Sequence, residues 1–216
     1  MSGIQRLSST AYQALIEGAE VIEQDHFGDK VLKLKDKTFL KLFRVKSTIS
    51  SAWLRPYSVR FVRNASELMA RGIQTVDIIS CYRLESYKNT AVHYRPLPGR
   101  TLRQVFPALD EDGTIVLAEQ VAQYIAHLHE QGIYFRSLHM GNILKLPDGA
   151  LGLIDIADMR FSRSPLKEAL RLRNLHHLAR YEQDVQYLIK DQAFCSTYAS
   201  LAGVDVDKIE AVMQRL

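Results

Sequence analysis

Two neighbouring stretches, GIYFRSLHMGNIL (residues 132–144) and LIDIAD (residues 153–158), are the strongest indication of the fold. The pattern predicts that a long helix ends, that a polar loop follows, and that the turn Pro147-Asp148-Gly149 returns the chain as a hydrophobic strand ending in Asp155. Such a hairpin is expected to place the Asn142 side chain beside the Asp155 carboxylate. An amide oxygen and a carboxylate suit Mg²⁺, a hard cation that shares its coordination shell with substrate phosphates.

The chain around this hairpin is expected to be mainly helical. An apolar stripe predicts a helix over residues 114–131, and its members are Leu117, Val121, Ile125 and Leu128. The hairpin strands are predicted over residues 142–146 and 151–155. Residues 165–216 predict two or three further helices.

The first part of the chain has a different pattern, in which short strands dominate. Strands are expected over residues 19–24, 30–35, 38–43, 76–84 and 91–94, and in residues 30–35 polar and apolar side chains alternate. A first helix is predicted over residues 11–18, with Thr10 and Gln13 at the spacing of a capping box. A second is predicted over residues 56–71, with Val59, Val62, Leu68 and Met69 roughly on one face.

A stiff segment, Arg95-Pro96-Leu97-Pro98-Gly99, separates the two parts and cannot continue a sheet. The sequence therefore predicts an α+β, two-lobed architecture in a single domain of 216 residues. The first lobe, a small and mostly antiparallel sheet, is expected over about residues 1–94. The connector is expected over about 95–100 and the helical second lobe over about 101–216. The cleft between such lobes is the expected ligand site.

Charge is distributed unevenly along a chain whose net charge is only +4. Residues 37–66 carry seven basic and no acidic side chains, and a second basic segment runs from Arg160 to Arg180. Such segments suit an anionic partner, such as nucleotide phosphate, a phosphorylated glycolipid or an anionic membrane surface, and they also suit a solvated basic face. Two cysteines are too few for a disulfide scaffold, and no apolar run approaches the roughly 20 residues of a membrane span. The sequence therefore predicts a soluble, cytoplasmic protein.

The loop and hairpin resemble the catalytic loop and metal-binding strand of the protein-kinase-like superfamily, where H-R-D-x-x-x-x-N precedes D-F-G. Within it, the chain is similar to the bacterial lipopolysaccharide core kinases that act on heptose or Kdo sugars, and especially to the short kinase-like toluene tolerance proteins. The resemblance runs from about residue 31 to 187, and its strongest parts are residues 97–102, 138–144, 153–155 and 170–180.

The resemblance implies a site for ATP and Mg²⁺. It makes Asn142 and Asp155 the metal ligands and Lys41, which alternates with Leu40 and Leu42 on a strand, the phosphate-binding lysine. It also makes residues 94–98 the adenine-contacting hinge, and the residues expected to bind the nucleotide are Lys41, Tyr94, Arg95 and Leu97. Lys33 and Lys35, on a neighbouring strand, are alternatives to Lys41.

The chain departs from the family pattern at three places. Ser137 stands where the aspartate that accepts the acceptor hydroxyl's proton is expected, and serine is not a base at neutral pH without a partner. Only Gly28 lies where a glycine-rich phosphate loop is expected. The helix that should pair a glutamate with Lys41 offers only Glu67, near its C-terminal end.

Other polar residues have simpler interpretations. His139 is expected to brace the loop, with a substitute base as the alternative, and Asp158 is interpreted as a helix cap in preference to a second metal ligand. His127 and His129 are two positions apart on a helix, so they are not expected to form a metal pair. His176 and His177 are expected to be structural.

Two functions stay open at this stage. The first is an ATP- and Mg²⁺-dependent kinase that uses Ser137, His139, Asn142 and Asp155 on a sugar hydroxyl of the lipopolysaccharide core, with an anionic glycolipid as partner. Its place would be the inner face of the cytoplasmic membrane, in peripheral contact with anionic lipid. The second is a pseudokinase scaffold that regulates envelope assembly, which Ser137 favours. Nucleic acid is not expected as a partner, because charge alone supports it.

Overall fold

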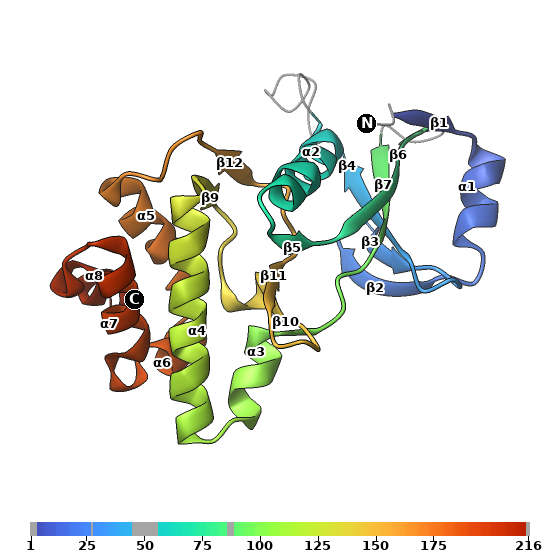
Figure 1. Ribbon diagram of the computed structural model, residues 1–216. Coiled ribbons are helices and arrows are strands. Elements are labelled where there is room, and N and C mark those ends of the chain that lie inside the picture. Colours follow the sequence, from blue (N-terminus) through green and yellow to red (C-terminus); the bar gives the residue numbers. More distant parts are fainter. Residues whose placement is uncertain (1–3, 27, 45–55, 86–88, 215–216) are drawn as a thin grey trace. The chain divides into compact units, whose positions relative to one another are not determined.

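The computed structural model describes residues 4–26, 28–44, 56–85 and 89–214, and the chain divides into two units, residues 1–97 and 98–216 (Figure 1). The boundary between the units falls within the segment 95–100. Each unit combines helices with strands, so the class is α+β. In the described ranges, no helix is both long and apolar enough to cross a membrane.

The first unit is built on a six-stranded sheet of order β1-β6-β7-β4-β3-β2. β1 and β6 are parallel, and the other neighbouring strands are antiparallel. The short strand β1 is not predicted by the sequence pattern. The strands are β1 (Gln5–Leu7), β2 (Glu20–Asp25), β3 (Gly28–Lys33), β4 (Phe39–Arg44), β6 (Asp77–Leu84) and β7 (Asn89–Arg95); the short β5 is Gln74–Thr75.

Two helices cover the opposite faces of this sheet (Figure 1). α1 (Ser9–Ile16) places Tyr12 against a cluster that includes Leu32, Leu40 and Ala91. α2 (Tyr57–Ala70) contacts β6 and β7 from the other side. Period-two alternation in β4 therefore puts Leu40 on the α1 face and Lys41 on the α2 face.

Both helices differ in detail from the sequence prediction. α1 begins at Ser9, because the side chain of Ser8 accepts a hydrogen bond from the Ala11 N–H at 3.2 Å and Thr10 lies inside the helix. The predicted face of α2 is only partly correct, because Leu68 is buried and Val59 and Val62 are half-buried. Met69 is 59% exposed, and the residues buried along α2 are Ser58, Phe61, Asn64, Ala65 and Leu68. Small and polar residues on this face allow α2 to approach the sheet. A search for aliphatic residues alone does not identify such a face.

The second unit surrounds the long helix α4 (Glu111–Glu130), whose buried residues include the whole predicted stripe. Up to residue 214, the last that the structure describes, four α-helices follow the hairpin, where the sequence predicted two or three helices. They are α5 (Glu168–Leu178), α6 (Glu182–Leu188), α7 (Ala193–Ala202) and α8 (Val206–Met213), with the short helix η3 (Lys190–Gln192) before α7. α4 and α7 pack against each other, and α5 contacts α8. Earlier in this unit lie α3 (Leu102–Val105) and η1 (Phe106–Ala108).

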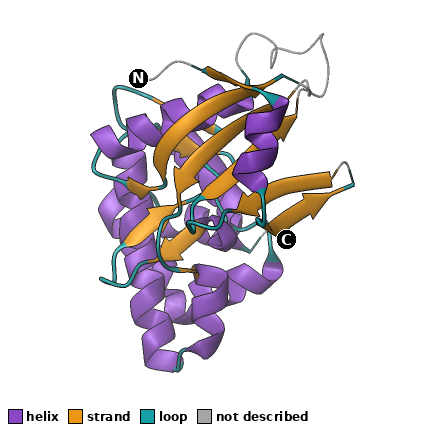
Figure 2. Ribbon diagram, turned by 90° about the vertical axis from the view of Figure 1, so that its right-hand side faces the viewer, coloured by secondary structure: helices purple, strands orange, loops and turns teal. Residues whose placement is uncertain are grey.

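Short strands of the second unit flank the loop that precedes the hairpin. β10 (Ile143–Lys145) pairs antiparallel with β11 (Leu151–Leu153) and with β8 (Arg100–Thr101). β9 (Ile133–Phe135) pairs antiparallel with β12 (Met159–Phe161), and Figure 1 labels these two strands beside each other. Figure 2 distinguishes the helices and strands of the chain by colour. Between β9 and β10 the chain forms a loop and one turn of 3₁₀ helix, η2 (Met140–Asn142). The loop is thus held at both ends by strand pairs.

The predicted turn between the hairpin strands is confirmed. Gly149 has φ of 85°, a conformation that glycine adopts at no steric cost. The Asp148 carboxylate accepts a hydrogen bond from the Ala150 N–H at 3.0 Å. The expected mechanism, an Asp-Gly pair that closes a tight turn, therefore operates here.

Candidate nucleotide and metal site

The loop after β9 is anchored by an asparagine from α5. The Asn174 amide donates to the Phe135 carbonyl at 2.6 Å and accepts from the Phe135 N–H at 3.1 Å. Its oxygen also lies 3.2 Å from Nε2 of His129, whose Nδ1 is 2.6 Å from the Tyr198 hydroxyl. An amide oxygen only accepts, so His129 carries its proton on Nε2. Burial lowers the pKa of His129 to about 4 and keeps it neutral. This network fixes the residue that directly precedes Arg136.

Within the loop, His139 braces the backbone as predicted. Its Nδ1 accepts a hydrogen bond from the Gly141 N–H at 3.1 Å, and the ring packs edge-on against Tyr181 at 5.4 Å. Burial lowers the pKa of His139, and Arg103 lowers it further, so the ring is neutral near pH 7. With Nδ1 accepting, the proton sits on Nε2. Neither ring nitrogen then has a lone pair available to take the proton of a substrate hydroxyl, unless the hydrogen bond from the Gly141 N–H breaks.

Arg103 and Asp184 form an ion pair beside this histidine. Nε and Nη2 of Arg103 donate to the two carboxylate oxygens of Asp184 at 2.8 and 2.6 Å. The guanidinium also lies over the Tyr181 ring, 4.7 Å from its centre. The Asp184 side chain is 1% exposed and that of Arg103 is 37% exposed, so this two-pronged pair is buried on its carboxylate side. It joins α3 to α6 and frames the loop.

Asn142 and Asp155 lie at the same end of the hairpin. The Ile154 N–H donates to the Asn142 carbonyl at 3.0 Å, which continues the β10–β11 ladder one step, and Asp155 follows directly. Nδ2 of Asn142 donates to the Ser137 carbonyl at 2.8 Å, so Oδ1 is the amide atom turned away from that contact. Asp155 has φ of 52°, in the left-handed region that residues other than glycine seldom adopt and that tends to occur at functional sites.

These two oxygen donors fit Mg²⁺ better than a metal that needs an all-protein cage. In the portion of the chain that the structure describes, no three or more His, Cys, Asp or Glu residues converge as a metal cluster. Mg²⁺ commonly takes one or two protein ligands and completes its octahedron with water and substrate phosphates. The donor set therefore agrees with a metal bound together with a phosphate ligand.

Asp158 is not a helix cap, contrary to the sequence interpretation. It precedes β12, and its carbonyl accepts a hydrogen bond from the Arg136 N–H at 3.0 Å. One carboxylate oxygen lies 3.8 Å from Nη1 of Arg136. Asp158 therefore helps to close the loop between β9 and β12.

Lys41 lies in the first unit, on β4, where it pairs with Val31 and Val92. It is only 7% exposed, and Nζ lies 5.7 Å from the centre of the Phe61 ring. Nζ also lies 5.9 Å from the centre of the Phe43 ring. The alternatives are surface residues, because Lys33 pairs with Glu20 at 3.0 Å and Lys35 with Glu17 at 3.9 Å. Burial thus distinguishes Lys41 from Lys33 and Lys35, the two alternative candidates for the phosphate-binding lysine.

Two further expectations about the first unit need adjustment. The expected helical partner Glu67 lies 3.5 Å from Arg71 on its own helix, which is the pair that the structure shows for it. Tyr94 was predicted to end a strand and Arg95 to begin the connector, but β7 extends one residue further and ends at Arg95. The Tyr94 ring packs against Phe39 and Phe61 at centroid distances of 5.9 and 5.7 Å.

Arg95, Leu97 and Gly28 also have defined places. Arg95 is exposed and donates to Asp77 at 2.8 Å, because the β6–β7 ladder runs to this residue. Leu97, beyond the strand, is half-buried. Gly28 begins β3, directly opposite Asp25 of β2, and has φ of 109°.

The basic segments do not form uniform cationic surfaces. Part of the segment 37–66 lies outside the described residues, and Lys41 within it is buried. In the segment 160–180, Arg171 is buried and donates to the Leu166 carbonyl at 2.7 Å and to Glu130 at 2.6 Å. Arg171 is therefore a structural residue, while Arg160 and Arg173 are exposed.

Sequence reasoning missed several residues that shape the site, namely Arg103, Asp184, Asn174 and Arg136. Their partners are distant along the chain; Arg103 and Asp184 are separated by 81 positions. Asn174 offered a weak signal, because asparagine inside a helix is unfavourable unless its amide has a specific partner. No protein-family model and no curated protein matches the chain.

Proposed function

We propose that this protein is an ATP- and Mg²⁺-dependent phosphotransferase of the protein-kinase-like class, acting on a sugar hydroxyl of an anionic glycolipid such as the lipopolysaccharide core. The observation that carries the proposal is the end of the β10–β11 hairpin. There, Asn142 with an oriented amide and Asp155 with a left-handed backbone end two paired strands. The resemblance of the loop sequence to lipopolysaccharide core kinases supports the choice of acceptor.

Each residue has a definite task under this proposal. Asn142 and Asp155 would hold Mg²⁺, which would neutralise charge on the nucleotide phosphates. The resemblance makes Lys41, which is 7% exposed, the lysine that would bind the nucleotide phosphates. Phosphoryl transfer depends mostly on positioning and electrostatic stabilisation. These three residues could therefore sustain turnover without a dedicated base.

Ser137 stands at the position of the expected general base, and this lowers the rate of phosphate transfer that we expect. A positioned general base contributes roughly 10²–10⁴-fold, and Ser137 cannot supply that contribution. His139 is not a good substitute, because its Nδ1 is engaged with Gly141. We therefore expect slow transfer in which Ser137 orients the acceptor hydroxyl.

Direct assay of phosphate transfer tests the proposal. Purified protein, labelled ATP, Mg²⁺ and deacylated core oligosaccharide should give labelled oligosaccharide, and Asp155→Asn should give none. Asparagine tolerates the left-handed conformation, so this variant removes the charge without imposing backbone strain. Asp112→Asn, an exposed carboxylate on α4, is the matched control and should retain activity.

A pseudokinase is the second candidate, and two observations favour it. Ser137 replaces the expected aspartate, and the one nearby imidazole is held by a backbone hydrogen bond. In that case Mg²⁺·ATP would bind and no phosphate would move to any sugar. The protein would then act as a nucleotide-dependent scaffold that regulates envelope assembly.

A further inference from the structure

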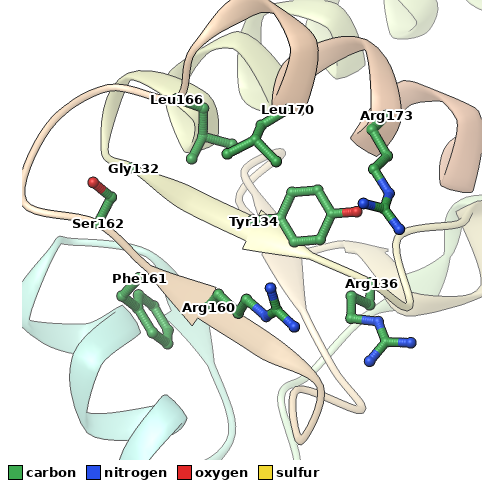
Figure 3. Close-up of a pocket in the computed structure, with 9 residues that line it drawn as sticks. All are labelled: Gly132, Tyr134, Arg136, Arg160, Phe161, Ser162, Leu166, Leu170 and Arg173. Atoms are coloured by element: carbon green, nitrogen blue, oxygen red, sulfur yellow. The ribbon is translucent and has the colours of Figure 1, made fainter.

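A pocket of about 280 Å³ opens between the β9–β12 strand pair and α5 in the second unit (Figure 3). Tyr134 of β9 lies at its centre. Arg136 follows β9, Arg160 belongs to β12 and Arg173 to α5. Three arginines from separate segments of the chain therefore line one cavity.

The pocket has a charged end and an apolar end. Figure 3 shows Arg173 and Arg136 on the side of Tyr134 where its hydroxyl lies and Arg160 below the ring, while Leu166 and Leu170 lie above its opposite side. Arg160 and Arg173 are exposed at the surface. The described residues that line the pocket include three arginines and no carboxylate, and Asp158 lies beside it at 3.8 Å from Arg136, so the lining carries a net positive charge.

The titration of a neighbouring histidine agrees with this positive field. The Tyr134 hydroxyl lies 3.0 Å from Nε2 of His177. Burial lowers the pKa of His177, and the positive charges of Arg180, His176, Arg136 and Arg173 lower it further. The same positive charges that disfavour protonation of His177 favour the binding of an anion.

We propose that this pocket binds a phosphate monoester through Arg136, Arg160 and Arg173, with the ring or chain of the ester lying against Leu166 and Leu170. Guanidinium groups match the oxygen spacing of phosphate and can bind it in two-pronged fashion. A phosphate monoester carries nearly two negative charges at neutral pH, which this net positive cluster can balance. The volume, at the lower limit of ordinary ligand sites, suits a single ring or sugar phosphate better than a large ligand.

Binding of phenyl phosphate, measured by calorimetry without nucleotide, tests this site. We expect phenyl phosphate to bind more tightly than inorganic phosphate, because only the former uses the leucines. Arg160→Gln with Arg173→Gln should weaken binding by roughly a hundredfold, about tenfold for each lost charge-assisted contact. Arg163→Gln removes an equal charge from the same segment but lies outside the pocket, so it should change affinity less than about twofold.

Three results would overturn the assignment. They are absence of binding at about 10 mM phenyl phosphate, equal loss of affinity in Arg163→Gln, and equal affinity for phenyl phosphate and inorganic phosphate. The altered arginines are exposed, so melting curves should show folded variants, and the single variants provide a second series. Asp155→Asn should bind phenyl phosphate normally, so failure of this site and failure of the proposed kinase function are distinguishable.

A glycolipid and a free metabolite could both supply the phosphate. Competition separates these sources: deacylated core oligosaccharide carrying a phosphate should displace phenyl phosphate if the glycolipid is the ligand, and its dephosphorylated form should not. Displacement by glucose 6-phosphate alone would identify a soluble sugar phosphate. Either displacement supports the phosphate site, whereas displacement by the dephosphorylated oligosaccharide would contradict it.

Discussion

The side-chain amide of Asn142 donates a hydrogen bond to the backbone carbonyl of Ser137 at 2.8 Å. The candidate metal ligand and the residue at the expected base position are thus connected through the backbone of Ser137. Replacing the Ser137 side chain leaves this bond intact. The position can therefore be altered without disturbing the orientation of the Asn142 amide.

Ser137→Asp is the first prediction that follows. If the protein is a slow kinase, the introduced carboxylate should accelerate phosphate transfer within the roughly 10²–10⁴-fold range of general-base catalysis. Initial rates with labelled ATP measure the effect, and Ser137→Asn is the uncharged control. No transfer by parent or variant, with nucleotide binding preserved, would instead support the pseudokinase alternative.

His139→Asn tests whether the histidine only braces the loop. Asparagine can accept the same Gly141 N–H hydrogen bond through a local Asx turn, but it has no imidazole. We expect the transfer rate to change less than about threefold, well below the roughly hundredfold minimum for loss of a base. Abolished turnover in a variant that melts like the parent would show that His139 is the base.

Nucleotide binding should depend on Asp155 and on Lys41. A ligand bound only by the folded state stabilises it by about 2.7 kcal/mol at a hundredfold excess over Kd. Mg²⁺·ATP should therefore raise the Tm of the parent by several degrees, and the rise should vanish in Asp155→Asn and in Lys41→Met. Lys33→Met is the matched control, because Lys33 is 41% exposed and pairs with Glu20. An unchanged shift in Asp155→Asn would refute the metal assignment.

Arg103→Met should destabilise the fold more than the loss of a surface ion pair does. It leaves the Asp184 carboxylate, which is 1% exposed, without its two-pronged partner, at an expected cost of about 3 kcal/mol. Arg95→Met breaks a pair of similar length, 2.8 Å, but both side chains are more than half exposed, and it should cost at most about 1 kcal/mol. Urea unfolding compares them, and equal losses would contradict the burial argument.

Arg171→Met separates structure from anion binding. Arg171 is buried and holds the Leu166 carbonyl and Glu130, so its loss should lower the free energy of unfolding by about 2–4 kcal/mol. Affinity for phenyl phosphate should stay near that of the parent at a temperature where the variant is folded. Weaker binding with unchanged stability would mean that Arg171 serves the ligand.

Acid should destabilise the second unit through His129. Its pKa is lowered to about 4 in the folded state, whereas an unfolded histidine titrates near 6.5. Below that value the unfolded chain gains a proton that the folded chain does not, so stability falls as pH decreases from about 6.5 to 4, by up to about 3 kcal/mol. Urea unfolding against pH should show a weaker fall in His129→Gln. The exposed His127→Gln should behave like the parent, and an unchanged pH dependence in His129→Gln would contradict the prediction.

The sequence alone determined the elements whose signals are local. The stripe from Leu117 to Leu128 predicted α4 because four apolar residues at helical spacing can be buried only on one face. The Asp148-Gly149 pair predicted the hairpin turn because the required backbone conformation is almost specific to glycine. With that turn in place, strand pairing brings Asn142 and Asp155 to one end of the hairpin.

The tertiary structure decided which polar residues face which partners. Arg171 and Arg173 lie two positions apart on α5 and carry the same charge. Arg171 is buried and binds Glu130, whereas Arg173 lines the pocket. Lys41, Lys33 and Lys35 look alike in sequence, and only the position of Lys41 under α2 distinguishes it. Residues far away in the chain supply the contacts of Asn174, Arg103 and Asp184. No local pattern encodes them, because the free energy of a charge depends on what surrounds it after folding.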